Sequence, residues 1–217
     1  MSVIFTKRVG STLKLGLWHI TESLPNLLKI RDFTNEELSR LNAFMYEKRK
    51  KEWLVSRILA GEMLDDKNVQ IIYNANNKPF LKGSSQHISL SHSHELLTVI
   101  IDEKETGIDL ELVKPTVGRI KDKFMSEKEL KEVGNENVLE KLTLYWCVKE
   151  SLYKYYGKKE LVFMDHLRVE PFVYTGTGSI IGKINHTKMK RSFELKYERL
   201  SIAGKDFMMA YIVGEVF

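Results

Sequence analysis

Four strand-like segments follow one another in the last quarter of the chain, with no helical pattern between them. They are rich in β-branched and aromatic residues, and short turns containing glycine, asparagine and lysine separate them. The segments are Leu167–Val173, Gly178–Ile184, Arg191–Leu200 and Phe207–Val213. Strands joined by such short connections pair with their neighbours in antiparallel order. This pattern therefore predicts an antiparallel sheet.

Helical patterns with clear end signals occur before this sheet. Thr34–Glu37 has the sequence of a capping box and opens a helix that continues to about Phe44, and a second helix is expected over Glu47–Leu64. Ser126–Glu129 is another capping box, and a long helix is predicted from about Val138 to Tyr156, where Gly157 ends it.

Shorter strand-like segments lie between these helices. They are Thr12–Ile20, Val69–Tyr73, His87–Leu90, Leu96–Asp102 and Gly107–Leu112. The last of them stops at Pro115, the clearest internal boundary. Because each half mixes helices and strands, we predict an α+β fold with two similar lobes, residues 1–104 and 105–217.

Composition narrows the possible partners. The single cysteine, Cys147, excludes an intramolecular disulfide and a cysteine cluster for zinc or iron–sulfur. The sequence has no secretory leader pattern and no apolar stretch of about 18 residues, so we expect a cytoplasmic protein without membrane contact. The net charge of +5 indicates an anionic partner, either a nucleic acid, a phosphate-rich cofactor or an acidic protein.

Two carboxylates share one face of the predicted strand Gly107–Leu112. Asp109 and Glu111 are two residues apart and point the same way, while Ile108 and Leu110 point to the other face. Neighbouring carboxylates repel, and a divalent cation such as magnesium makes their proximity favourable. The alternative is an exposed edge strand with solvated acids.

The long helix presents a second constellation. Trp146, Glu150 and Lys154 follow one another at i, i+4 spacing and so lie along one helix face. A carboxylate and an ammonium are thus offered together beside a large aromatic ring. The alternative is a surface ion pair worth about 0.3–0.5 kcal/mol.

A third group of residues suits phosphate. In Ile88–His94, the end of a strand carries serine hydroxyls and two imidazoles, which can donate hydrogen bonds to an anion. A Ser-His hydrolase fails on geometry because adjacent residues on an extended chain face apart. The basic run Glu47–Trp53 also suits phosphate, although such runs are commonly the solvated face of a helix.

Taken in order, four elements resemble the surfactin-synthetase type of 4′-phosphopantetheinyl transferase. They are Asn77–Pro79, Ser91–Ser93, Gly107–Glu111 with the pattern Gly-Ile-Asp-x-Glu, and Trp146–Lys154 with the pattern Trp-x-x-Lys-Glu-Ser-x-x-Lys. The resemblance implies transfer of phosphopantetheine from coenzyme A to a serine of an acidic acyl or peptidyl carrier protein, with release of adenosine 3′,5′-bisphosphate. It also implies a monomer of two α+β lobes related by pseudo-twofold symmetry, each a mostly antiparallel sheet with helices, and coenzyme A in the cleft between them.

The same resemblance assigns roles to individual residues. Asp109, Glu111 and Glu150 match the Mg²⁺ ligands, and Lys154 matches a lysine that contacts the phosphates. The proton acceptor is left open between Glu150, Glu129, Glu127 and a bound water.

The coenzyme A contacts carried over lie mainly in the first lobe. The expected partners of the 3′-phosphate are Lys48, Lys51, Arg57 and His92, with Lys78 and Ser91 as further contacts. The segment between Lys51 and Arg57 is shorter than in the best-known members, so the position of Arg57 is open.

Two other functions explain part of the sequence. A metal-dependent phosphodiesterase or pyrophosphatase would share the carboxylates and the phosphate-binding lysines. A nucleic-acid-binding module would explain the charge, but it lacks interleaved stacking aromatics and leaves the acidic strand unexplained, so we expect no nucleic-acid partner.

Overall fold

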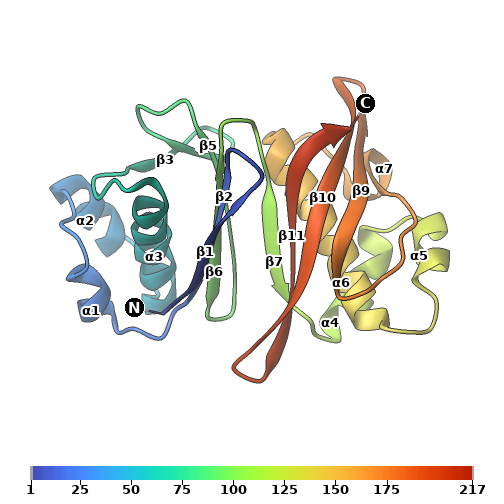
Figure 1. Ribbon diagram of the computed structural model, residues 1–217, viewed down its shortest axis with the longest axis horizontal. Coiled ribbons are helices and arrows are strands. Elements are labelled where there is room, and N and C mark those ends of the chain that lie inside the picture. Colours follow the sequence, from blue (N-terminus) through green and yellow to red (C-terminus); the bar gives the residue numbers. More distant parts are fainter. Residues whose placement is uncertain (1, 217) are drawn as a thin grey trace. The chain divides into compact units, whose positions relative to one another are not determined.

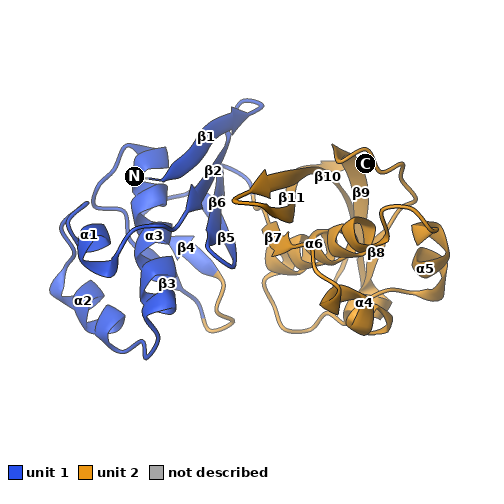
Figure 2. Ribbon diagram, turned by 90° about the horizontal axis from the view of Figure 1, so that it is seen from below, with its two compact units in different colours: residues 1–74, 79–104 blue, residues 75–78, 105–217 orange. Residues whose placement is uncertain are grey.

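The structure is a computed structural model that describes residues 2–216, and the chain divides into two compact units (Figures 1 and 2). The first comprises residues 1–74 and 79–104, and the second comprises residues 75–78 and 105–217. Each unit contains helices and an antiparallel sheet, which confirms the mixed helix-and-strand class. No helix among the described residues has the length and apolarity needed to cross a bilayer.

The first unit is built on a four-stranded antiparallel sheet. Its strand order is β1 (Val3–Val9), β2 (Leu13–His19), β6 (Leu96–Asp102) and β5 (His87–Ser93). The remaining elements are α1 (Leu24–Leu28), α2 (Asn35–Asn42), α3 (Glu47–Leu64), β3 (Ile71–Tyr73) and β4 (Pro79–Leu81).

Helix α3 lies directly against strand β2. A Cβ added to Gly16 would come within 2.9 Å of the Leu59 side chain and 2.7 Å of Met63 Sδ, so the absence of a side chain permits this close packing. Trp18 and Leu54 are fully buried in the same core.

The second unit is built on a five-stranded antiparallel sheet. Its strand order is β7 (Ile108–Leu112), β11 (Lys205–Val216), β10 (Met189–Ile202), β9 (Thr177–His186) and β8 (Leu167–Val169). Its helices are α4 (Thr116–Ile120), a 3-10 turn (Lys121–Lys123), α5 (Glu127–Val133), α6 (Val138–Tyr156) and α7 (Phe163–His166). The four C-terminal strands predicted from the sequence are therefore present, although β8 ends before Pro171.

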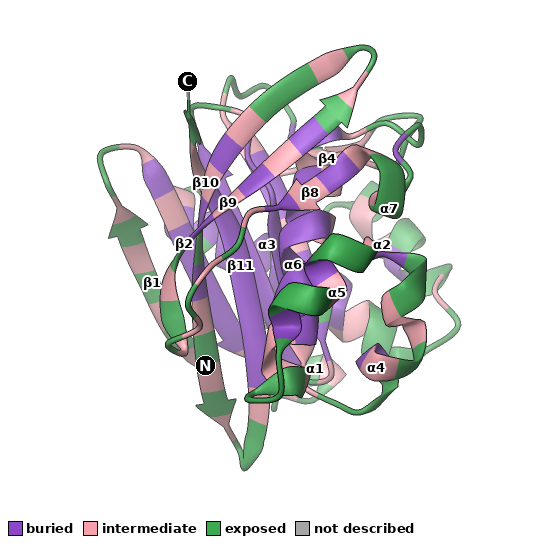
Figure 3. Cartoon of the chain, turned by 90° about the vertical axis from the view of Figure 1, so that its right-hand side faces the viewer, coloured by how far each residue is buried: buried purple, intermediate pink, exposed green. Residues whose placement is uncertain are grey.

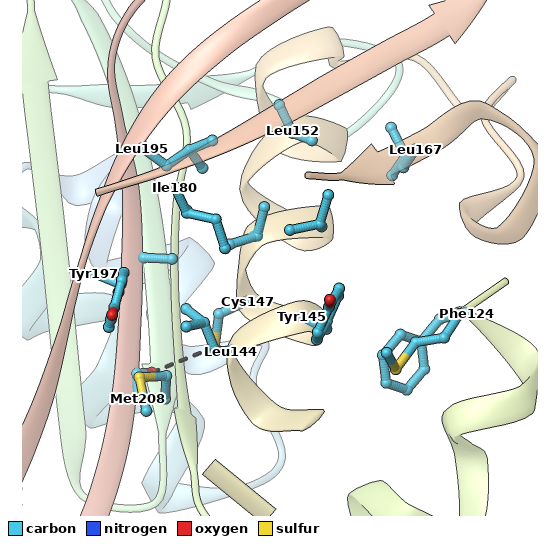
Figure 4. Packing of buried hydrophobic residues seen from close by; sticks show 14 of the residues in the cluster. Phe124, Leu144, Tyr145, Cys147, Leu152, Leu167, Ile180, Leu195, Tyr197 and Met208 are labelled. Atoms are coloured by element: carbon cyan, nitrogen blue, oxygen red, sulfur yellow. Dashed lines mark hydrogen bonds between the residues drawn. The ribbon is translucent and has the colours of Figure 1, made fainter. Parts of the chain in front are cut away.

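Helix α6 supplies the core of this unit. Cys147, Leu144 and Leu152 of α6 are fully buried against the sheet, and the Cys147 thiol donates to the Met208 carbonyl oxygen at 3.3 Å (Figure 4). Figure 3 shows α6 mostly buried and α5 mostly exposed. The helix ends at Gly157, where φ is +67°, as the sequence predicted.

The two units have similar internal connectivity. In the first, β2 leads to α3 and β6 returns antiparallel beside β2; in the second, β7 leads to α6 and β11 returns antiparallel beside β7. The pseudo-twofold relation between the lobes stays a prediction.

One loop belongs to a different unit from the one expected. Residues 75–78 group with the second unit, whereas the sequence placed them in the first. Lys78 explains the difference, because its ammonium donates to the Tyr155 carbonyl oxygen at 2.6 Å and pairs with Glu105 at 2.8 Å.

Candidate active site

Strand β7 turns its two carboxylates toward helix α6. Asp109 is the cross-strand partner of Ala210, and Glu111 is the partner of Met208. Directly opposed residues share a face of the sheet. Since Ala210 and Met208 belong to the core cluster that contains the buried residues of α6, both carboxylates lie on the helix-covered face.

Gly107 and Ser151 allow α6 to lie against this strand. A Cβ on Gly107 would stand 2.1 Å from the Ser151 carbonyl oxygen, so any side chain there would collide with the helix backbone. The Ser151 hydroxyl lies 2.8 Å from the Cys147 carbonyl oxygen and 2.9 Å from that of Ala210, with hydrogen-bond geometry to both. The glycine of one motif and the serine of the other thus fix the distance between the two elements.

Lys154 of α6 reaches Asp109 directly. Its ammonium donates to Asp109 Oδ1 at 2.7 Å and to the Ile108 carbonyl oxygen at 2.8 Å. The Asp109 side chain is 5% exposed and that of Lys154 is 26% exposed. The predicted lysine and one predicted metal ligand are therefore in contact.

Glu150 lies within the electrostatic field of the same group. Burial, together with the negative charges of Asp109 and Glu111, raises the pKa of Glu150 to about 7, and the positive charge of Lys154 offsets part of this rise. The three predicted carboxylates are thus close enough to influence one another. Their oxygens are the hard donors that suit Mg²⁺.

The side chains do not form a ready-made metal cluster. Among residues 2–216, no three His, Cys, Asp or Glu side chains converge closely enough to hold a metal ion. Instead, Asp109 forms an ion pair with Lys154.

Glu129 is buried and accepts hydrogen bonds on both carboxylate oxygens. It is 3% exposed, and Oε2 accepts hydrogen bonds from the Lys149 ammonium at 2.8 Å and from the Ser126 amide at 2.8 Å. Its other oxygen accepts from the Val169 amide at 3.0 Å. The predicted capping box Ser126–Glu129 is confirmed, and these contacts hold Glu129 in place inside the second unit.

Arg57 requires a correction. We expected it to contact a phosphate, but it is 1% exposed, and its guanidinium lies 3.6 Å from the centre of the Trp53 ring. It donates to the carbonyl oxygens of Trp53 at 3.1 Å and Ile71 at 2.9 Å. Burial lowers its pKa to about 10. Arg57 therefore holds α3 to β3.

His92 has two partners that the sequence reasoning missed. Its Nε2 lies 2.9 Å from the Arg49 guanidinium, and its Nδ1 lies 3.4 Å from Glu52. Arg49 and Glu52 also pair at 3.1 Å, although Glu52 is 5% exposed. The sequence did contain a signal for these contacts, because Glu52 is an acid within the basic run and lies three residues after Arg49.

The other predicted phosphate contacts in the first unit differ in exposure. Lys48 is exposed, Lys51 pairs with Glu47 at 3.0 Å, and Ser91 is buried. Of these three, Lys48 is the most accessible to an anion.

A family of known proteins matches most of the second unit. Residues 105–211 match the model of the 4′-phosphopantetheinyl transferase superfamily. The match includes β7 and α6, and so Asp109, Glu111, Glu150 and Lys154. The resemblance noted in the sequence is confirmed.

Two curated relatives are similar to part of the chain. A 4′-phosphopantetheinyl transferase psf-1 of Bacillus pumilus is 30% identical over 95 residues, which is 41% of this chain and 41% of that protein. A 4′-phosphopantetheinyl transferase of Bacillus subtilis is 27% identical over 110 residues, 49% of each chain. The similarity to these phosphopantetheinyl transferases thus spans less than half the length of either one.

Proposed function

We propose that this chain transfers 4′-phosphopantetheine from coenzyme A to a serine hydroxyl of an acyl or peptidyl carrier protein and releases adenosine 3′,5′-bisphosphate. The observation that carries the proposal is that β7 and α6, inside the segment that matches the superfamily, bear Asp109, Glu111, Glu150 and Lys154, with Lys154 bound to Asp109 and both strand carboxylates near enough to raise the pKa of Glu150. We infer that the reaction takes place in the cytoplasm and that the chain acts as a monomer.

The chemistry requires no nucleophile from the protein, because the attacking hydroxyl belongs to the carrier. Glu150 is the proposed acceptor of the serine proton, directly or through a bound water, because it is the predicted site carboxylate on α6 and in the metal-free protein its pKa is raised to about 7. Glu129 is a weaker candidate, because both of its oxygens are engaged inside the second unit.

Lys154 is the proposed phosphate contact. Its ammonium would donate to an oxygen of the coenzyme A pyrophosphate and balance the charge that develops on the leaving group. Its 26% exposure supports access by such a ligand.

Asp109, Glu111 and Glu150 are the residues proposed to hold Mg²⁺. Their carboxylate oxygens are the hard donors that Mg²⁺ prefers, although the three side chains do not converge on one point among residues 2–216. When bound, the ion would neutralise the pyrophosphate and polarise the phosphorus that is attacked.

In the first unit, Lys48, Lys51 and His92 are proposed to contact the 3′-phosphate of coenzyme A, and Arg49 joins them because it bonds to His92. Ser91 and Lys78 remain predicted contacts from the resemblance. Arg57 is no longer included, since its guanidinium is buried.

An acidic carrier is supported by the distribution of charge. Residues 158–191 contain seven basic and three acidic residues, so this segment accounts for most of the net charge of +5. Basic surfaces steer acidic partners into an encounter complex and speed association.

The test is release of adenosine 3′,5′-bisphosphate from coenzyme A and Mg²⁺, measured with and without an apo-carrier. Transfer predicts release only when the carrier is present, and Asp109→Asn should abolish it in a protein that still folds. Rapid release without a carrier would instead identify a phosphodiesterase or pyrophosphatase.

A further inference from the structure

Lys154 contacts Asp109 on the same carboxylate that is proposed to bind the divalent cation. The ammonium lies 2.7 Å from Asp109 Oδ1 and 2.8 Å from the Ile108 carbonyl oxygen, so two hydrogen bonds fix it at strand β7. Only 5% of the Asp109 side chain is exposed. Water screens the interaction poorly at such a site.

Two positive charges at one carboxylate repel each other. A divalent cation that binds Asp109 would stand within a few ångströms of the ammonium, and partial burial strengthens that repulsion. A phosphate group changes the balance, because an ammonium and a divalent cation can bind different oxygens of one phosphate.

We propose that Lys154 is a counter-ion of Asp109 that opposes cation binding in the substrate-free protein and moves to a phosphate oxygen when coenzyme A arrives with the cation. This inference rests on the proposed function and goes beyond it, because it makes cation binding depend on the substrate. The two ligands then bind with positive coupling, and Lys154 is the source of the coupling.

A structural role for Lys154 makes a different prediction. If the lysine only pins α6 to β7, removing its charge changes stability and leaves cation affinity alone. Lys154→Gln shortens the side chain and keeps hydrogen-bond donors but no charge, whereas Lys154→Arg keeps the charge. Lys158→Gln is the matched control, because Lys158 is exposed, follows α6 and loses the same charge.

The experiment measures Mn²⁺ binding to the full chain by electron paramagnetic resonance, first without and then with coenzyme A. Without coenzyme A, Lys154→Gln should bind Mn²⁺ at least about 10-fold more tightly than the wild type, while Lys154→Arg and Lys158→Gln should not. Coenzyme A should tighten Mn²⁺ binding by the wild type and have much less effect on Lys154→Gln. Thermal melts of each variant report whether it is folded.

The outcomes separate the two proposals. Equal Mn²⁺ affinity of the wild type and a folded Lys154→Gln overturns the counter-ion role, while tighter binding in the presence of coenzyme A would leave the transferase proposal standing. Tight binding by Lys154→Arg also overturns the role, because the charge would then not be the cause. If Lys154→Gln does not fold, Lys154→Met takes its place. Failure of every protein to bind Mn²⁺ with coenzyme A overturns both proposals.

Discussion

The buried ion pair between Glu129 and Lys149 gives the clearest test of which glutamate is structural. The Lys149 side chain is fully buried and that of Glu129 is 4% exposed, with Nζ and Oε2 2.8 Å apart. Lys149 also donates to the Phe124 carbonyl oxygen at 2.6 Å. Glu129→Gln removes the negative charge and leaves the ammonium buried without a counter-charge.

Removing one partner of a buried ion pair costs about 3–5 kcal/mol. We therefore expect Glu129→Gln to lower the free energy of unfolding by this amount, measured by urea denaturation. In the double variant with Lys149→Met no uncompensated charge remains, so the two effects should be non-additive by at least about 2 kcal/mol.

Glu127→Gln is the control for this series. Glu127 is exposed and lies two residues before Glu129 in the same helix, so its substitution should change the free energy of unfolding by about 0.5 kcal/mol or less. A Glu129→Gln protein as stable as the wild type but inactive in transfer would refute the structural reading and return Glu129 to the catalytic candidates.

Three further predictions concern other sites. Gly107→Ala should destabilise the second unit by about 2–3 kcal/mol in denaturation experiments, because its Cβ would stand 2.1 Å from the Ser151 carbonyl oxygen; wild-type stability would contradict this packing. In metal-free protein, the pKa of Glu150 rises from 4.5 to about 7 on folding, so its stabilising contribution is complete below pH 4.5 and is lost as pH rises to 7. Glu150→Gln should remove a decrease of about 3 kcal/mol over that range, and parallel pH profiles for the two proteins would contradict the shift. Arg57→Ala should lower thermal stability without changing the preference for coenzyme A over dephospho-coenzyme A, because its guanidinium stacks on Trp53; loss of that preference would restore a phosphate-binding role.

The sequence predicted those elements whose stabilising contacts lie within one short segment. The capping boxes at Thr34 and Ser126 form as expected, because the bonds of each box lie within four residues. Strand β1 and helices α1 and α7 were not predicted, since they are short or half-exposed and their apolar periodicity is weak. Lys78 was assigned to the first lobe because its contacts with Tyr155 and Glu105 are distant in the sequence.

Strand and helix periodicity predicted which side chains of the site point the same way. Alternation on the strand correctly placed Asp109 and Glu111 on one face, but only the register with β11 shows that this face is covered by α6. The burial of Arg57 was not predictable, because its partners include the Ile71 carbonyl oxygen beyond the end of α3. The burial of Glu129 was not predictable either, because its partner Lys149 lies twenty residues further along the chain.

The intact mass of an apo-carrier protein after incubation with this chain, coenzyme A and Mg²⁺ tests the transferase proposal directly. We expect the carrier to gain one phosphopantetheine group on its serine, and we expect no gain with Glu150→Gln or without Mg²⁺. A panel of fatty-acid, polyketide and peptidyl carriers would define the substrate. An unchanged mass for every carrier in the panel, with folded enzyme and bound coenzyme A, would show that the chain is not a phosphopantetheinyl transferase for these carriers.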